Sequence, residues 1–309
     1  MKKSCYIVLT YNNDHDTIET LDGILSQSIA DKMDTIVIDN ASYKEYRNKV
    51  EKYCRIHNIQ YYYRKENDGY AGGNNYAWEK LKTDYDYMFI VNNDIVFNSK
   101  RISEKIIKIF NQHPEIGAIG PVVKTGNNEI AKDCAIFNVF FGKQIFGHKY
   151  HRTKEFHERY AVVGCFIAIN VKAIDRNYLF NKSFFMYSEE LELCLRIWKR
   201  GFRVAALNND RYSVYHKGGK DPFEKGGEWK FYLASRNLAL CAKEFEIADK
   251  VFFLILQFAS VMKRVFCGPG NKRERISSLR GYMKGLYFVL ARSNADQIYQ
   301  DACDQIIRI

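Results

Sequence analysis

Short apolar runs alternate with segments of helical periodicity through the first third of the chain. The apolar runs occupy residues 5–10, 35–40, 59–64 and 87–94, and each has the length of a buried strand. Between them, apolar residues recur every three or four positions, as in residues 14–28. This order of elements predicts an α/β fold in which a parallel sheet carries helices on both faces.

Polar residues stand at the carboxyl ends of three of these predicted strands. The runs end in Thr-Tyr-Asn at 10–12, Asp-Asn at 39–40 and Asn-Asn-Asp at 92–94. In open α/β sheets, ligands bind at the carboxyl ends of the strands. We therefore expect a ligand site at this edge of the sheet.

The remainder of the chain is first strand-like and then helical. From about residue 228 onward it is predicted to be helical almost to its end. We expect an α/β domain of residues 1–240 and a helical C-terminal region of residues 241–309. Within residues 117–216, a helix is predicted over 188–200, ending before Gly201. Strands are predicted at 117–124, 135–142, 160–171, 203–207 and 212–216.

The composition is that of a globular protein with a basic surface. Hydrophobic residues make up 47% of the 309 residues, enough for a large core. The 47 basic and 36 acidic residues give a net charge of +11, which suits nucleic acid, an anionic membrane or a phosphorylated substrate. Because the basic residues do not interleave with a recognisable nucleic-acid motif, we expect no nucleic-acid partner.

Cysteine usage and the absence of long apolar segments indicate a cytoplasmic location. The eight cysteines include no CxxC pair and lie mostly in apolar runs, which is typical of buried thiols in a reducing compartment. The N-terminal apolar run is too short for a signal peptide. No stretch reaches the ~18 apolar residues of a membrane-spanning helix.

Asp39 and a glycine-rich segment suggest nucleotide binding. Asp39 ends an apolar strand and can accept a hydrogen bond from a base or a ribose hydroxyl, although Asp39 or Ser42 can equally cap the next helix. Residues 66–78 contain a Gly-rich turn at 68–73 that opens a helix and lets backbone N–H groups approach an anion. The alternative is a simple loop that uses glycine for positive φ. The segment is neither GxGxxG nor a P-loop, which argues against a nicotinamide oxidoreductase.

Asp94 and His216 are candidate ligands of a metal ion. Asp94 follows a buried strand with Asn92 two residues before it, an arrangement that suits Mg²⁺ or Mn²⁺. The alternative is an N-cap or Asx turn made by Asn93 or Asp94. A lone histidine such as His216 is more often structural, but glycines and lysines follow it in a loop suited to phosphate.

Three glutamates crowd the start of the helix predicted over 188–200. Acidic residues in a first turn are favoured by the helix dipole, which is one explanation. Adjacent carboxylates in an apolar setting also raise one another's pKa, which is how a general base is tuned. The candidates for such a base are Glu189, Glu190 and Glu192.

The order of these motifs over residues 4–240 resembles family 2 inverting glycosyltransferases, notably the bacterial rhamnosyltransferase-like branch. Members share a strand ending in TYN, a DN-S strand end, an N-G-A-GGN-N segment, an Asn-x-Asp or Asp-x-Asp element, FFMY-ED-D-C-R, and a histidine near glycines. The corresponding positions here are Thr10–Asn12, Asp39–Ser42, Asn67–Asn75, Asn92–Asp94, Phe184–Arg196 and His216.

The resemblance implies a GT-A-like fold with a mixed, mostly parallel sheet, and it implies roles for the matching residues. Asp94 and His216 would hold the metal, and Glu190 would be the catalytic base. An Arg-Asn pair, Arg236 and Asn237, also matches the family, but no role is assigned to it. The donor site would comprise Thr10, Tyr11, Asn12, Asp39, Asn67, Gly72, Gly73, Asn74, Asn92 and Asn93.

Two departures from the family pattern suggest an alternative function. The usual EDvD is EELE here, so the base is a glutamate, and the metal element NND has one carboxylate where many relatives have two. A nucleotide-sugar-binding protein without catalysis is therefore the alternative. The main prediction is an inverting, Mg²⁺- or Mn²⁺-dependent transfer from a UDP- or dTDP-sugar to a lipid-linked polysaccharide.

The C-terminal region combines apolar and basic segments. Residues 251–262 are apolar but too short to span a bilayer. Residues 263–292 carry eight basic residues against the single acid Glu274. This pattern predicts a peripheral anchor on an anionic membrane at the inner face of the cell membrane. The alternatives are an ordinary packed helix and a homo-oligomer interface.

Overall fold

The computed structural model describes residues 2–126, 129–130, 155–175, 177–218, 227–268 and 270–307. It divides into two compact units. The sheet unit comprises Met1–Asp68, Gly72–Leu179 and Cys194–Lys220, and the helical unit comprises Gly69–Ala71, Phe180–Leu193 and Asp221–Ile309. In the helical unit, residues 180–193 and the helix before residue 240 pack with the C-terminal helices. The expected domain boundary at residue 240 stays a prediction.

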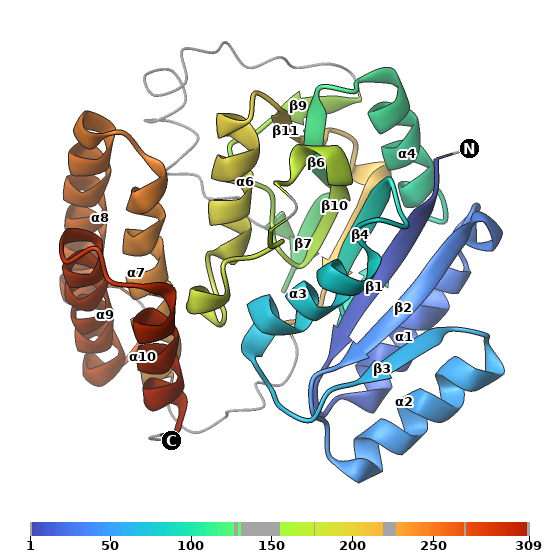
Figure 1. Ribbon diagram of the computed structural model, residues 1–309, viewed down its shortest axis with the longest axis horizontal. Helices are drawn as coiled ribbons and strands as arrows, with labels where there is room; N and C mark the ends of the chain where they lie inside the picture. The colour runs from blue at the N-terminus through green and yellow to red at the C-terminus, as the bar shows by residue number, and fades with distance from the viewer. Residues whose placement is uncertain are drawn as a thin grey trace. The chain divides into compact units, whose positions relative to one another are not determined.

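An eight-stranded sheet is the centre of the sheet unit (Figure 1). The strand order is β3-β2-β1-β4-β10-β6-β11-β9. Neighbours β3, β2, β1 and β4 are parallel, whereas β10 runs antiparallel to both β4 and β6. The sheet is therefore mixed. The strands are β1 (Ser4–Thr10), β2 (Met33–Asp39), β3 (Gln60–Tyr63), β4 (Tyr87–Asn92), β6 (Ile116–Gly120), β9 (Phe156–Glu158), β10 (Phe166–Asn170) and β11 (Arg203–Leu207).

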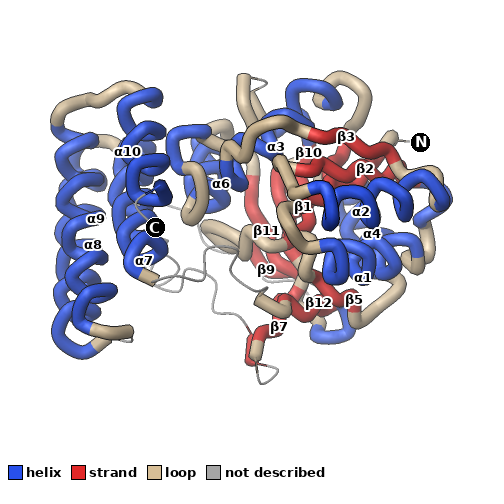
Figure 2. The backbone as a smooth tube through the Cα atoms, turned by 90° about the horizontal axis from the view of Figure 1, so that it is seen from below, coloured by secondary structure: helices blue, strands red, loops and turns tan. Residues whose placement is uncertain are grey.

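Helices cover both faces of this sheet, as predicted (Figure 2). The helices α1 (Asp14–Leu25), α2 (Lys44–Ile56) and α4 (Ile102–Gln112) bury their apolar sides in one core with alternate residues of the strands, including Val8 and Val37. Side chains alternate along a strand, so Leu9 points to the opposite face. That face receives α3 (Gly69–Leu81) and the last turns of α6 (Glu189–Lys199).

A second, smaller sheet places a histidine beside the end of β4. Its strand order is β5-β12-β7-β8, with bounds Ile95–Phe97, Ser213–His216, Val122–Thr125 and Glu129–Ile130. The antiparallel pairing of β12 with β5 sets His216 opposite Ile95. The predicted strand 117–124 is thus two strands, β6 and β7, that belong to different sheets.

In its described residues, the helical unit has four long helices, α7 (Glu228–Leu240), α8 (Ile247–Cys267), α9 (Lys272–Leu290) and α10 (Ala295–Ile307). Two glycines let the backbones of α7 and α9 approach closely. A Cβ at Gly281 would lie 2.1 Å from the carbonyl oxygen of Tyr232, and one at Gly285 would lie 2.5 Å from that of Arg236. Among the described helices, none is long and apolar enough to cross a membrane.

One further predicted strand is shorter in the structure. The strand predicted at 160–171 is confined to Phe166–Asn170, after a loop that ends at Cys165. The strand predicted at 135–142 lies outside the described residues.

Candidate active site

The polar ends of three strands meet at one edge of the main sheet. Parallel pairing sets Thr10 of β1 beside Asp39 of β2, and Leu9 of β1 beside Asn92 of β4. The loops that follow these residues therefore emerge side by side. The prediction that polar residues gather at the carboxyl edge of the sheet is confirmed.

Asn12 joins the loop after β1 to the loop after β2. Its backbone has a φ of 49°, in the left-handed region that asparagine tolerates. Its N–H donates to Ser42 Oγ at 2.9 Å, and its Oδ1 accepts from the N–H of Tyr43 at 2.8 Å. The loops are thereby held together next to Tyr11, whose side chain is partly exposed.

Thr10 and Asn93 belong to a hydroxyl network inside the protein. The Thr10 hydroxyl lies 2.8 Å from that of Thr17 on α1, and both accept from the side-chain amide of Asn93, at 3.4 and 3.0 Å respectively. Thr10 is also buried. The network fixes the ends of β1 and β4 against α1, while a nucleotide contact by Thr10 stays a prediction.

Asp39 is fully buried, and both of its oxygens have partners. Oδ1 accepts from the N–H of Ser42 at 2.7 Å, and Oδ2 accepts from the hydroxyl of Tyr61 at 2.6 Å. Burial, followed by the hydrogen bond to Asp39, raises the pKa of Tyr61. The carboxylate closes the turn at 39–42 and does not cap α2, whose N-cap residue Tyr43 makes no side-chain capping bond.

A polar network that the sequence did not reveal lies beside Asp39. Arg64 follows β3, and its Nη1 donates to Asn40 Oδ1 at 2.7 Å while its Nη2 pairs with Asp68. The amide of Asn40 donates to Asn67 Oδ1 at 2.6 Å. Arg64 therefore fixes the amide of Asn40, and that amide holds Asn67, a predicted donor-site residue, at the same edge of the sheet.

The Gly-rich segment is not a turn, which corrects the interpretation from sequence. The helix α3 begins at Gly69, which alone among the described glycines of this segment has a positive φ, of 72°. Gly72 and Gly73 are helical. A Cβ on Gly73 would lie 2.4 Å from a methyl carbon of Leu9, and one on Gly72 would lie 2.3 Å from Cβ of Asp68. Gly73 therefore lets the helix pack closely on β1, and Gly72 makes room for Asp68. Asn74 is buried beside them.

Asp94 and His216 are brought together from distant parts of the chain. His216 Nε2 lies 3.2 Å from Asp94 Oδ2, and the side chains are 25% and 8% exposed, so a ligand can reach the imidazole. The N–H of Lys217 donates to the carbonyl oxygen of Asp94 at 3.1 Å. The pairing of β12 with β5 thus sets the geometry of the pair.

The donors around this pair suit a divalent cation. Asn92 Oδ1 is buried and has no hydrogen-bond partner among the described residues. A carboxylate, an amide oxygen and an imidazole are ligands that Mn²⁺ accepts, and the oxygens also suit Mg²⁺. Asp94 and His216 are therefore the residues that would hold a metal, with Asn92 two residues before Asp94.

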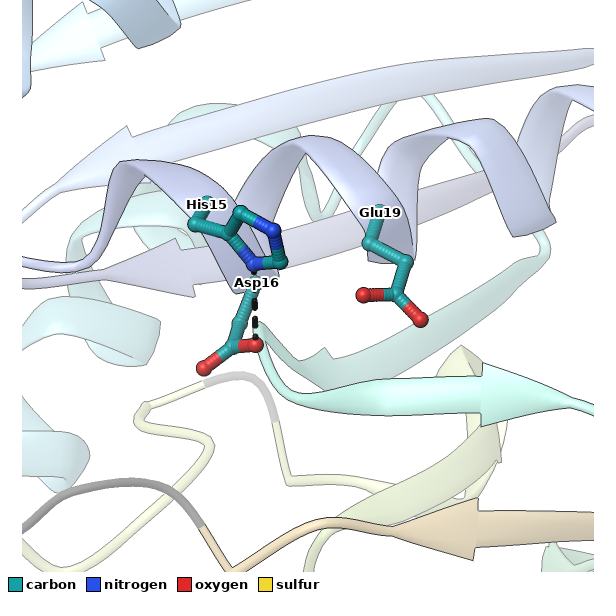
Figure 3. Close-up of side chains that lie close together, drawn as sticks. All are labelled: His15, Asp16 and Glu19. Carbon is teal, nitrogen blue, oxygen red and sulfur yellow. Dashed lines mark ion pairs between the residues drawn. The ribbon is translucent and has the colours of Figure 1, made fainter.

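A second acidic group fits a metal less well. His15, Asp16 and Glu19 at the start of α1 bring their ligand atoms within 4.8 Å of one another (Figure 3). However, the ammonium of Lys217 lies 2.7 Å from Asp16 Oδ1 and 2.5 Å from Glu19 Oε2. Because that ammonium already pairs with two of the three candidate ligands, we assign no metal to this group.

The predicted base belongs to the helical unit, at the first turn of α6. Glu189 and Glu192 are buried, whereas Glu190 is partly exposed. Burial raises the pKa of the Glu189 carboxyl, and the charge of Glu190 raises it further. Burial also raises the pKa of Glu190. Of the three candidates, Glu190 combines a raised pKa with access to solvent.

The match to a family model identifies the class of the protein. Residues 5–177, more than half of the chain, match the model described as glycosyl transferase family 2. The chain therefore belongs to glycosyl transferase family 2. The prediction of a family 2 glycosyltransferase is confirmed, whereas the rhamnosyltransferase-like branch, the inverting mechanism and the metal dependence stay predictions.

Individual relatives agree with this assignment. The chain is 23% identical over 245 residues to the low-salt glycan biosynthesis hexosyltransferase Agl10 of Haloferax volcanii, covering 76% of this chain and 74% of that protein. In fold it is similar to S. aureus TarS 1-349 in complex with UDP-GlcNAc, with a TM-score of 0.64, 16% identity and coverage of 99% and 88%. It is also similar to the mannosyltransferase PcManGT of Pyrobaculum calidifontis in complex with GDP-Man and Mn²⁺, with a TM-score of 0.59, 14% identity and coverage of 95% and 88%. The expected GT-A-like fold is confirmed.

Proposed function

We propose that the protein is an inverting hexosyltransferase that uses a UDP- or dTDP-sugar, with the rhamnosyltransferase-like branch as its nearest functional class. The observation that carries the proposal is the Asp94–His216 pair at 3.2 Å, beside the carboxyl edge of the sheet. The names of the relatives support a nucleotide-sugar donor and a hexosyl group, since they include a hexosyltransferase and complexes with UDP-GlcNAc and GDP-Man.

The loops after β1, β2 and β3 are proposed to bind the nucleotide. Tyr11 and Asn67 are partly exposed and supply contacts to the base and ribose. Thr10 and Asp39 shape the site through their buried hydrogen bonds, because their side-chain oxygens already have protein partners. The fixed loops would spare the protein the entropy of ordering them when the donor binds.

Asp94 and His216, with the oxygen of Asn92, are proposed to hold a divalent metal next to the diphosphate of the donor. When bound, the metal neutralises the charge that develops on the leaving diphosphate. Mn²⁺ in the mannosyltransferase complex supports this choice of ion, and Mg²⁺ is equally compatible with the oxygen donors.

Glu190 is proposed to take the proton from the acceptor hydroxyl. The hydroxyl oxygen then attacks the anomeric carbon from the side opposite the diphosphate, the bond from that carbon to the diphosphate breaks, and the configuration inverts. The raised pKa of Glu190 suits a group that must accept a proton. Because glutamate is one carbon longer than the family's aspartate, the acceptor would lie farther from the helix backbone.

Product analysis tests the proposed function. A panel of nucleotide-sugars is incubated with the protein, Mn²⁺ and a lipid-linked glycan acceptor, and the products are examined by mass spectrometry and NMR. We expect one hexose or deoxyhexose to be added with inverted anomeric configuration and one nucleoside diphosphate to be released. Tight donor binding without transfer or hydrolysis would instead support a binding protein that lacks catalysis.

We also propose that α8 and α9 hold the enzyme on an anionic membrane, where a lipid-linked acceptor would be found. Exposed apolar side chains recur along one side of α8, namely Ile247, Val251, Ile255 and Phe258. A similar row lies along α9, namely Ile276, Met283, Tyr287 and Leu290. Basic side chains accompany both rows, including Lys263 and Arg280, which are exposed. Apolar rows with flanking positive charge match an interfacial helix pair.

Vesicle co-sedimentation tests this attachment. The full-length protein is expected to pellet with anionic vesicles at low salt and to be released by high salt, because the Debye length shortens. Replacing Val251 and Ile255, which are 53% and 60% exposed, by aspartate should abolish binding. Ile56→Asp is the matched control, since Ile56 is 66% exposed but lies on α2. A wild-type protein that stays in the supernatant at low salt would contradict the proposal.

A further inference from the structure

Arg236 is a fully buried cation at the centre of the helical unit. Its Nη1 donates to Asp301 Oδ2 and to the carbonyl oxygen of Ile298 on α10, both at 2.9 Å. Its Nη2 donates at 3.1 Å to the carbonyl oxygen of Ser183. One guanidinium therefore links α10 to the segment that precedes α6.

Asn237 binds the same segment at three places. Its side-chain amide donates to the carbonyl oxygens of Phe184, Met186 and Tyr187, at 2.9, 2.7 and 2.9 Å. Its Oδ1 accepts from Nε and Nη2 of Arg236, at 2.9 and 2.8 Å. The orientation of the amide is thus fixed by the guanidinium, and all of its hydrogen-bonding capacity faces the turn or Arg236.

The bound segment has an unusual backbone. Phe185, Tyr187 and Ser188 have φ values of 62°, 74° and 65°, in the left-handed region that disfavours residues other than glycine. The next residue, Glu189, is the first of α6. Strained conformations persist only where the surroundings determine them, and they cluster at functional sites. Arg236 and Asn237 together donate to the carbonyl oxygens of four residues of the segment 183–188, so they are major contributors to holding this turn.

We propose that Arg236 and Asn237 are positioning residues for the catalytic base. They hold the backbone of residues 183–188 in a single conformation. This conformation sets the direction in which α6 begins, and therefore the position of the Glu190 carboxylate. This inference rests on the proposed function, because it takes Glu190 as the base. It gives a role to the Arg-Asn pair that matches the family pattern.

The test compares two variants in the same hydrogen-bond cluster of the full-length protein. Asn237→Asp keeps the size of the side chain and its acceptor for Arg236, but it removes both amide N–H donors and with them all three hydrogen bonds to the turn. Asp301→Asn weakens the interaction of Arg236 with α10 and leaves the hydrogen bonds from Asn237 to the turn in place. We expect Asn237→Asp to lower kcat for transfer by about 10- to 100-fold with donor KM unchanged, since a misplacement of 1 Å costs about 100-fold. Asp301→Asn should lower Tm with kcat close to that of the wild type.

A double-mutant cycle separates positioning of the base from a general loss of structure. In a Glu190→Gln background, Asn237→Asp is expected to lower the remaining single-turnover rate by less than about threefold, because the group it positions has already been removed. If too little Asn237→Asp protein folds, Arg236→Lys replaces it. Lysine keeps a charge for Asp301 but cannot reach both α10 and the turn.

Three outcomes overturn the inference. A wild-type kcat in both Asn237→Asp and Arg236→Lys would show that the turn needs no such support. Independent, multiplying effects of Asn237→Asp and Glu190→Gln would show that the pair does not act through Glu190, while leaving the proposed function intact. Full activity of Glu190→Gln alone would refute the assignment of the base and this inference with it.

Discussion

Replacing Glu190 by glutamine is expected to slow sugar transfer by about 10²–10⁴-fold, the contribution of a positioned general base. The amide keeps the size and polarity of the side chain but cannot accept the proton. Donor binding should be unchanged, because no proton moves in that step. The measurement is the initial rate of product formation at saturating donor and acceptor, with donor affinity determined by calorimetry.

The glutamates on either side provide matched controls. Glu189 and Glu192 are both buried, so Glu189→Gln and Glu192→Gln should change stability more than the rate of transfer. The base must be deprotonated, so the rate should rise with pH through its pKa. Because burial raises the pKa of Glu190, the acid limb should lie at higher pH than for an ordinary glutamate and should be missing in Glu190→Gln. A normal rate of transfer in Glu190→Gln together with a large loss of rate in Glu189→Gln would show that Glu189 is the base.

Replacing Asp94 by alanine is expected to reduce transfer by at least about 100-fold, since a metal at a developing charge supplies several kcal/mol. The variant loses the carboxylate that lies beside His216, and donor affinity should fall only when Mn²⁺ or Mg²⁺ is present. Direct binding of Mn²⁺, followed by electron paramagnetic resonance in the presence of a nucleoside diphosphate, should weaken in parallel. His216→Ala should also lower the rate of transfer and weaken Mn²⁺ binding, but by less than Asp94→Ala.

The second acidic group supplies the control for the metal prediction. Asp16→Asn and Glu19→Gln remove carboxylates that Lys217 already pairs with, so neither should alter the Mn²⁺ dependence of transfer. If these variants lost the dependence and Asp94→Ala kept it, the metal would lie at α1. Full activity of the wild type in excess chelator would exclude a metal at either place.

The central strands could be predicted because their patterns are local. β1, β2 and β4 are continuous apolar runs that end in polar residues, and their parallel pairing follows from the helices between them. The antiparallel insertion of β10 between β4 and β6 has no such pattern, because it depends on a pairing between distant segments. For the same reason, the sequence does not distinguish β6 from β7 across Pro121. The helix α4 was not predicted although its pattern is local, with Ile102, Ile106 and Ile109 buried along one side.

The site was predicted less completely than the fold. The pairing of Asp94 with His216 could be expected only from the family resemblance, since no spacing rule connects two residues so far apart. The glycines at 72 and 73 were interpreted as a turn, whereas Gly73 makes room for Leu9 and Gly72 for Asp68, contacts that no local pattern reveals. Arg64 was missed because a basic residue after a strand looks like any solvated side chain.

The ion pair between Arg236 and Asp301 also has a consequence for the order of events during synthesis. The two residues are 65 positions apart, and domains begin to fold while the chain is still being made. Until α10 has left the ribosome, Arg236 lacks both of its partners on that helix, and the apolar cluster that Phe185 of the turn shares with Ala302 cannot form, so the turn before α6 cannot be fully held. The sheet unit, by contrast, has received its last described strand by residue 216. We therefore expect a nascent chain to acquire its nucleotide loops well before it acquires a fixed base, so that donor cannot be consumed by an unfinished enzyme.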